Sequence, residues 1–352
     1  MNLKTLDYDL PKELIAEKPV SPRDKSFLIN VKNNFEIYKF SYLKNLLRKG
    51  DCLVINNTKV IPAKLSGFCD GKKISVTLNS LEKKKPSVEW TAFCKPLKRI
   101  DKNQKIKFSD KLIGEIYDIK KSDGLPYLII SFKLNFTSFL REIEKLGKIA
   151  LPPYIKTIRN FNSLDKKNYQ TIFSKIQGAV AAPTASLHFS QKLKTMLIKN
   201  GVKIVYVTLH VNGATFLPIR TENVNDHKMH HEYGEITKKS SILINNIKKD
   251  GGKLIAVGTT VLRLLESSKD KEGYVLPFKG KTNIFIKPGW QINTIDGLIT
   301  NFHTPHSSLL LILHTLIGEK RTRELYEYAI QNKIRFLSYG DACLIWTNNE
   351  RP

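Results

Sequence analysis

Residues 298–308 have the sequence Leu-Ile-Thr-Asn-Phe-His-Thr-Pro-His-Ser-Ser, and this stretch decides the fold. A short apolar run ends at Asn301, a polar loop with two histidines follows, and the strongly apolar segment 309–317 begins after Ser307. Serine is a favoured residue just before a helix, so the pattern predicts strand, loop and helix in that order. In open α/β sheets, ligands bind at such junctions, beyond the carboxyl ends of the strands.

The same order of elements recurs along the chain. Apolar runs at 52–55, 204–209 and 254–257 predict buried strands, and helices are expected from Ser190, Ser240 and Val261. A late strand is expected at 342–346. Strands that alternate with helices are typical of a mainly parallel sheet. Four sets of polar residues follow these strands, and we expect them on one edge of the sheet: Asn56, Asn57 and Thr58; His210; Gly258, Thr259 and Thr260; and Asn301 with His303. The alternative is four ordinary turns, because these are also turn-forming residues.

Residues 63–150 have a different pattern. Short β-rich runs at 73–78, 88–94, 112–117 and 127–132 alternate with turn residues, a short helix is expected at 140–146, and 151–154 (Leu-Pro-Pro-Tyr) resembles a stiff linker. The predicted fold class is α/β, and α+β for the multi-domain chain as a whole. Residues 1–62 and 151–352 would form the main α/β catalytic domain, barrel-like or open-sheet, and residues 63–150 an inserted small antiparallel β-barrel domain.

Charge is the strongest compositional signal. The chain has 58 Lys and Arg against 32 Asp and Glu, a net charge of +26. Such an excess predicts a polyanionic partner such as nucleic acid. The abundance of Lys, Ile and Asn is equally typical of proteins from AT-rich genomes, in which lysine accumulates without a functional role. Charge alone leaves both interpretations open.

The cysteines and the apolar runs bear on location. Cys52, Cys69, Cys94 and Cys343 form no CxxC pair, so neither a zinc motif nor a thioredoxin-type motif is indicated. We expect reduced thiols in a cytoplasmic protein. The N-terminus does not resemble a signal peptide. The run 309–317 is shorter than the ~20 residues that span a bilayer, so no membrane partner is expected.

Two further groups of residues are candidates for chemistry. Gly258 to Thr260 open a helix, whose start attracts anions, yet Arg263 lies in its first turn. Either Glu266 or a ligand carboxylate or phosphate would compensate that charge. The segment 226–232, Asp-His-Lys-Met-His-His-Glu, is the densest group of titratable side chains. It fits acid–base or substrate-binding use, a metal site, or a surface histidine cluster.

The long motifs of the chain resemble one family, the S-adenosylmethionine:tRNA ribosyltransferase-isomerases of queuosine biosynthesis. The resemblance covers nearly the whole sequence. It is carried by Tyr8-Asp9-Leu10-Pro11, residues 14–16, 54–63, 151–155, 178–189, 208–211, 215–216, 226–227, 229–230, Glu232, 256–260, Arg263, 265–267, 284–286, 288–289, Thr300-Asn301-Phe302-His303 and Ser338-Tyr339-Gly340-Asp341-Ala342. The chain departs from the family pattern where Asn212 and Ala214 replace glycines, where Val261-Leu262 replaces Ser-Val, and at Ser75, where an acid is common. We expect activity to be retained.

The resemblance implies a reaction. The ribosyl unit of S-adenosylmethionine is transferred to the aminomethyl group of 7-aminomethyl-7-deazaguanine in tRNA and isomerised, which gives epoxyqueuosine and releases adenine and methionine. It also implies a monomer with S-adenosylmethionine as co-substrate, no prosthetic group and no metal.

Roles for individual residues follow as hypotheses. Acid–base catalysis is assigned among His303, His227, His230, Asp226 and Glu232. Substrate binding is assigned to Asn56, Asn57, Thr58, His210, Gly258, Thr259, Thr260, Arg263 and Asn301, and tRNA binding to Lys72, Lys73, Lys95, Lys98 and Arg99. Two rival functions remain: a metal-dependent hydrolase built on residues 227–232, and a non-catalytic RNA-binding protein supported by charge alone.

Overall fold

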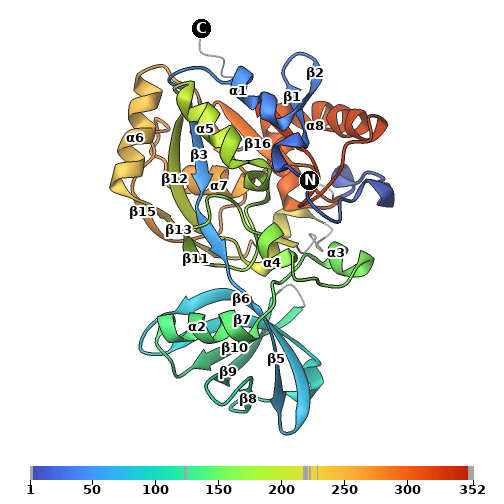
Figure 1. The fold of residues 1–352 in the computed structure, drawn as a ribbon, viewed down its shortest axis with the longest axis vertical. Helices are drawn as coiled ribbons and strands as arrows, with labels where there is room; N and C mark the ends of the chain where they lie inside the picture. The colour runs from blue at the N-terminus through green and yellow to red at the C-terminus, as the bar shows by residue number, and fades with distance from the viewer. Residues whose placement is uncertain (1–2, 123–124, 217–220, 222, 228, 348–352) are drawn as a thin grey trace.

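The computed structural model describes residues 3–122, 125–216, 221, 223–227 and 229–347. Figure 1 shows two bodies, a small β-barrel below and a larger α/β body above. Among the described helices, none is both long and apolar enough to cross a membrane.

The small body is a closed barrel, as the sequence predicted. Within the described residues its strand order is β10-β7-β6-β5-β8-β9. The strands are β5 (Lys64–Cys69), β6 (Lys72–Lys83), β7 (Val88–Lys95), β8 (Lys105–Lys107), β9 (Ile113–Ser122) and β10 (Leu125–Phe132). Helix α2 (Phe136–Leu146) buries Phe139 and Ile143 against the same core as Trp90. The sequence-derived domain boundaries, 1–62 with 151–352 and 63–150, stay a prediction.

The large body is built on an open sheet with the order β15-β13-β12-β3-β14-β16-β17-β1-β2 within the described residues. The strands are β1 (Phe27–Val31), β2 (Phe35–Lys39), β3 (Cys52–Asn56), β12 (Lys203–His210), β13 (Glu232–Ile236), β14 (Leu254–Val257), β15 (Phe278–Thr282), β16 (Gly297–Asn301) and β17 (Ala342–Trp346). Strands β4 (Thr58–Val60) and β11 (Ile176–Ala179) pair with each other separately.

The direction of the strands differs in part from the prediction. The central strands β12, β3, β14 and β16 are parallel. Outside them the sheet is mixed, because β17 runs antiparallel to β16, and β13, β15 and β2 are antiparallel to their neighbours. The expectation of a mainly parallel sheet is therefore correct for its centre only.

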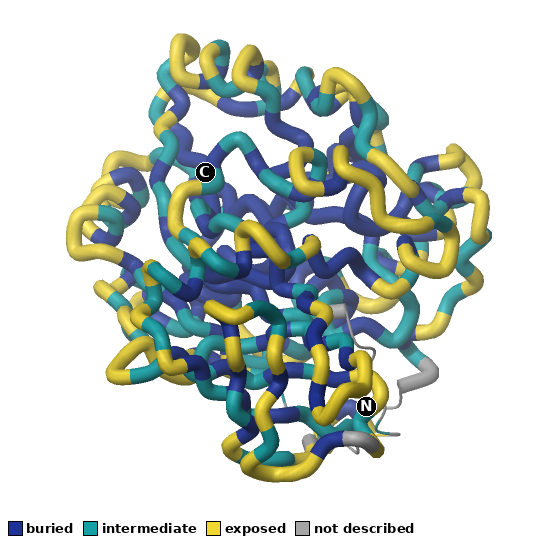
Figure 2. The backbone as a smooth tube through the Cα atoms, turned by 60° about the horizontal axis from the view of Figure 1, so that its bottom comes forward, coloured by how far each residue is buried: buried dark blue, intermediate teal, exposed yellow. Residues whose placement is uncertain are grey.

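The central strands are largely apolar because helices cover both faces of the sheet. Cys52 and Val54 of β3 face one core cluster, with α6 (Lys238–Lys249), α7 (Thr259–Ser267) and α8 (Ser308–Gln331). Leu53 and Ile55 face the other, with α1 (Leu43–Leu46) and α5 (Gln191–Lys199). In Figure 2 the buried residues gather in the middle of the larger body, and exposed residues lie around the outside of the molecule.

Helix ends test the local predictions. Ser190 caps α5 by accepting from the Leu193 amide, and Ser307 caps α8 by accepting from the Leu309 amide, as predicted. The stiff linker predicted at 151–154 is wrong, because α3 (Pro153–Ile158) begins within it, with Pro153 at a position that suits proline. Helix α4 (Asp165–Asn168) follows, and short 3-10 helices include η6 (Thr184–His188), η7 (Gly213–Phe216) and η8 (Val224–Asp226).

Candidate active site

The carboxyl ends of four adjacent parallel strands form one edge of the sheet. Strands β12, β3, β14 and β16 lie side by side in this order, so the four sets of polar residues predicted to share an edge do share it. Parallel strands have this effect because their carboxyl ends point the same way.

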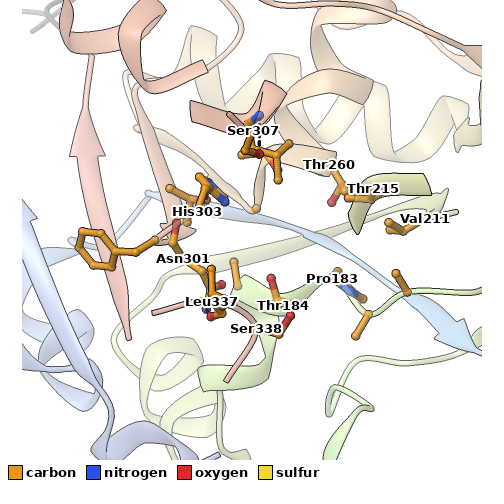
Figure 3. A pocket seen from close by; sticks show the side chains of 18 of the residues that line it. Pro183, Thr184, Val211, Thr215, Thr260, Asn301, His303, Ser307, Leu337 and Ser338 are labelled. Carbon is orange, nitrogen blue, oxygen red and sulfur yellow. Dashed lines mark hydrogen bonds between the residues drawn. The ribbon is translucent and has the colours of Figure 1, made fainter. Parts of the chain in front are cut away.

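A cavity of about 100 Å³ lies at this edge, and we call it the edge pocket. Figure 3 shows His303 and Asn301 on one side of it, with Thr260, Thr215 and Val211 on another. The described residues that line it are Tyr154, Ala181, Ala182, Pro183, Thr184, Ala185, Val211, Thr215, Gly258, Thr259, Thr260, Thr300, Asn301, Phe302, His303, Thr304, Ser307, Leu309, Leu337 and Ser338. Small side chains at 181–185 leave the room for it.

His303 is held firmly at the pocket wall. Its backbone N–H donates to the Tyr326 hydroxyl at 2.9 Å, and the Tyr8 hydroxyl donates to its carbonyl. Its Nε2 lies 3.0 Å from the Thr300 hydroxyl. Desolvation lowers the pKa of His303 to about 3. The imidazole is therefore neutral near pH 7 and can accept a proton, but it carries none to donate as an imidazolium.

Two buried oxygens at the pocket lack a partner among the described residues. They are Oγ1 of Thr260, in the first turn of α7, and Oδ1 of Asn301. The Asn301 amide nitrogen is used, since it lies 3.2 Å from Nε2 of His188 and donates to the Leu337 carbonyl. Buried polar atoms in proteins almost always have a partner. A ligand with hydroxyl or amine donors would supply one to each oxygen.

Four of the predicted substrate-binding residues instead join β3 to β12. The Asn56 side chain binds the backbone of Leu209 and of Thr58. The Thr58 hydroxyl lies 2.7 Å from Nδ1 of His210, and Asn57 accepts from the Thr208 hydroxyl. Burial lowers the pKa of His210 to about 4, and its ring packs against Gly178, where a β-carbon would come within 2.8 Å. These four are not among the described residues of the edge pocket, and substrate binding by them stays a prediction.

Arg263 has a partner that the sequence did not indicate. Its Nη1 donates to Oε2 of Glu232 at 2.6 Å, with both side chains buried. Glu266, the expected intramolecular partner, instead accepts from Trp290 and Thr294 and pairs with Lys269. The predicted pairing of Arg263 with Glu266 is therefore wrong. Nη2 of Arg263 is buried and has no partner among the described residues. A ligand anion at Arg263 stays a prediction.

The titratable segment 226–232 is divided by the fold. Asp226 is exposed at the end of η8, and Glu232 turns inward to Arg263. His227, His230 and His231 line a second cavity, between the barrel and the large body, which we call the interdomain cleft. The structure therefore does not bring this segment into the edge pocket with His303, and the catalytic assignments stay predictions.

The basic residues assigned to tRNA lie on the barrel. Lys72, Lys73, Lys95 and Lys98 are exposed, and β6 and β7 pair at Ser75 and Lys95. The side chain of Arg99 lies outside the described part of the structure. Burial, together with the charges of Lys64 and Lys95, lowers the pKa of Lys156 on α3. Positive charges thus gather where the barrel meets α3.

Sequence reasoning missed several residues of the edge pocket. Tyr154 and Ser338 join across it through their hydroxyls, and Thr184 and Thr215 add two more hydroxyls to its lining. Residues 151–155 and 338–342 were singled out as motifs without a role, and that was the available signal. Asn212 and Ala214 do not adopt positive φ, so replacing family glycines there causes no left-handed strain.

Within the described residues, no group of three or more His, Cys, Asp or Glu side chains is placed to hold a metal ion.

Comparison with known proteins gives the same family at every level. The family model described as queuosine biosynthesis protein matches residues 3–345. A protein of Ruegeria sp. (strain TM1040), named S-adenosylmethionine:tRNA ribosyltransferase-isomerase, is 41% identical, with 98% of this chain and 99% of that protein covered. A protein of Zymomonas mobilis with the same name is 40% identical, with the same coverage. The crystal structure of S-adenosylmethionine tRNA ribosyltransferase from Thermotoga maritima aligns with a TM-score of 0.54 at 28% identity, covering 97% of this chain and 99% of that one.

Proposed function

This chain belongs to the queuosine biosynthesis protein family, and we propose that it catalyses the detailed reaction implied by that membership. It is a transferase and isomerase that modifies tRNA. The proposal concerns the finer chemistry. The ribosyl unit of S-adenosylmethionine passes to the amine of 7-aminomethyl-7-deazaguanine in tRNA, epoxyqueuosine forms, and adenine and methionine leave.

The observation that best supports this proposal is the edge pocket, which we assign to the ribosyl donor. The unpartnered Oδ1 of Asn301 is an acceptor, the unpartnered Thr260 hydroxyl can accept or donate, and the hydroxyls of a ribose can pair with both. The pocket is smaller than the roughly 300–1,000 Å³ of most ligand sites, so we infer that it takes the sugar while the rest of the donor extends outside it.

His303 lines the edge pocket as a neutral imidazole, and we assign it the role of the base on this position. The reaction requires loss of a proton next to the sulfonium, whose charge acidifies the carbon, and a neutral imidazole accepts such a proton. Protonation of the adenine leaving group needs a separate acid. The predicted share of His227, His230, Asp226 and Glu232 in acid–base catalysis is kept, with Glu232 restricted by its ion pair to Arg263.

Binding of tRNA is assigned to the basic face of the barrel. Four lysines of this face are exposed to solvent: Lys72, Lys73, Lys95 and Lys98. The pKa of Lys156 is lowered by burial and by neighbouring positive charges, which bound phosphates would neutralise. A monomer in the cytoplasm, without a prosthetic group, completes the proposal.

Mass spectrometry of the nucleoside tests the function. Purified protein is incubated with S-adenosylmethionine and tRNA that carries 7-aminomethyl-7-deazaguanine. The expected result is epoxyqueuosine, with adenine and methionine released together. Tight tRNA binding without adenine release would favour the rival RNA-binding function. Activity that depends on a stoichiometric metal found by elemental analysis would favour the hydrolase.

A further inference from the structure

The interdomain cleft is the larger of the two cavities described above, at about 620 Å³. Strands β6, β7, β9 and β10 form its barrel side, and the described residues of its other side are His227, Met229, His230, His231, Lys281, Asn283 and Phe285. An ion pair of 2.6 Å between Lys281 and Glu82 joins the two sides. The volume of the interdomain cleft lies in the range of ordinary ligand sites, which is roughly 300–1,000 Å³.

The lining of the cleft combines flat aromatic faces with hydrogen-bonding and cationic groups. Phe93, Tyr127 and Phe285 are partly buried in it, and the ring of His227 packs edge-on against Phe285 at 5.6 Å. Ser80, Thr91 and Asn283 supply hydroxyls and an amide, and Lys120 supplies a positive charge, while the charge of Lys281 is paired with Glu82. Aromatic faces stack on nucleobases, polar groups read their edges, and lysines bind phosphate. The ligand that fits all of these together is a nucleotide.

One short turn separates this cleft from the edge pocket. Thr215 of η7 lines the edge pocket, while the backbone N–H of its neighbour Ala214 donates to Oδ1 of Asn79, a cleft residue, at 3.0 Å. Oε1 of Glu232 accepts from the N–H of Asn212, just before this turn, at 3.1 Å. A group transferred directly between two ligands requires that their sites adjoin.

We propose that the interdomain cleft holds one unstacked nucleotide of the acceptor RNA, and that η7, which borders both this cleft and the edge pocket, is the wall that positions the nucleotide beside the ribosyl donor. The identity of the RNA rests on the proposed function. A base paired inside a duplex cannot enter a cleft between two domains, so the occupant is a nucleotide of a single-stranded loop. This geometry brings His227 and His230 to the acceptor and His303 to the donor.

Binding of a labelled anticodon stem–loop RNA that carries 7-aminomethyl-7-deazaguanine tests the cleft. The double variant Tyr127→Ala, Phe285→Ala should weaken binding by about tenfold or more, because it removes stacking on both rings. Tyr117→Ala is the matched control, since Tyr117 is an exposed barrel tyrosine, 66% accessible, that does not line the cleft. Calorimetry should give wild-type affinity for S-adenosylmethionine in both proteins, and circular dichroism checks that each is folded.

The outcomes separate this inference from the proposed function. If the folded double variant binds the stem–loop as tightly as an active wild type does, the cleft is not the nucleotide site, while the proposed function stands. Loss of S-adenosylmethionine affinity in the double variant also overturns the nucleotide site, because the cleft would then hold the donor. Stem–loop binding that needs the two rings, in a wild type that releases no adenine, supports the cleft and refutes the function.

The wall is tested at Asn79. Asn79→Leu removes the acceptor for the Ala214 N–H, and Asn79→Asp retains one. With both substrates saturating, single-turnover rates should fall at least tenfold in Asn79→Leu and recover in Asn79→Asp. Wild-type rates in both variants would overturn the role of η7.

Discussion

Nη1 of Arg263, on α7, donates to Oε2 of Glu232, on β13, across 2.6 Å, and the two side chains are only 4% and 2% exposed. The other oxygen of Glu232 accepts from the Asn212 N–H and from the Thr215 hydroxyl. A charge pair behind the sheet edge therefore holds the turn that lines the edge pocket. This ion pair links a residue predicted to be catalytic with one predicted to bind substrate.

Glu232→Gln tests what this pair contributes. Neutralising the carboxylate leaves the Arg263 charge buried without compensation, so the free energy of unfolding should fall by about 3–5 kcal/mol. Urea unfolding measures it. Glu235→Gln on the same strand is the control, since its pair with Lys279 spans 4.0 Å and is exposed, and it should cost less than about 1 kcal/mol. Equal losses in the two variants would contradict the account.

His303→Asn tests the base at the edge pocket. Turnover should fall by about 100-fold or more, while affinity for S-adenosylmethionine changes little. His306→Asn, in the same loop but outside the described pocket lining, is the matched control and should keep wild-type turnover. Adenine release in single turnovers gives the rate. Comparable rates in wild type and His303→Asn would remove His303 from the chemistry.

Stability should depend on pH through buried histidines. Burial lowers the pKa of His188 and of His210 to about 4, and that of His303 to about 3, below the unfolded value of roughly 6.5. Between pH 6.5 and 4 the unfolded chain binds protons that the native protein does not. Stability is thus fully present above pH 6.5 and decreases as the pH falls, by about 1.4 kcal/mol per pH unit for each such histidine. Urea unfolding at intervals from pH 7.5 to 4.5 checks this, and a flat profile would contradict it.

Neutralising the barrel lysines should change the salt dependence of tRNA binding. With Lys72, Lys73, Lys95 and Lys98 replaced by Gln, the slope of log K against log salt should become shallower by about 0.7–0.9 for each phosphate that the protein no longer neutralises. The comparison is Lys238, Lys239 and Lys249 on α6, exposed residues on the large body, whose replacement by Gln should leave the slope unchanged. Equal slopes in both sets would mean that the net charge acts without a defined binding surface.

The sequence predicted best what depends on neighbouring residues. The caps at Ser190 and Ser307 are hydrogen bonds between neighbouring residues, so the local sequence predicted them. The strand 52–55 is apolar because both of its faces are covered, so its run of apolar residues predicted a buried strand. The edge formed by four strand ends followed in turn from their parallel direction.

Long-range pairing could not be predicted in this way. The partner of Arg263 comes from a strand more than 30 residues earlier, where only the spacing to Glu266 was visible. The antiparallel pairing of β16 with β17 also depends on residues far apart in the chain. Asn56 and His210 were chosen as polar residues at strand ends, and the structure uses their hydrogen-bonding atoms to join the strands.

The most direct test of the central claim follows the ribosyl carbons. The protein is supplied with S-adenosylmethionine labelled with ¹³C in every ribose carbon and with tRNA that carries 7-aminomethyl-7-deazaguanine. The account predicts that the modified nucleoside gains all of the labelled carbons, while released adenine and methionine gain none. An unlabelled nucleoside, or label that stays with a released adenosine, would contradict it.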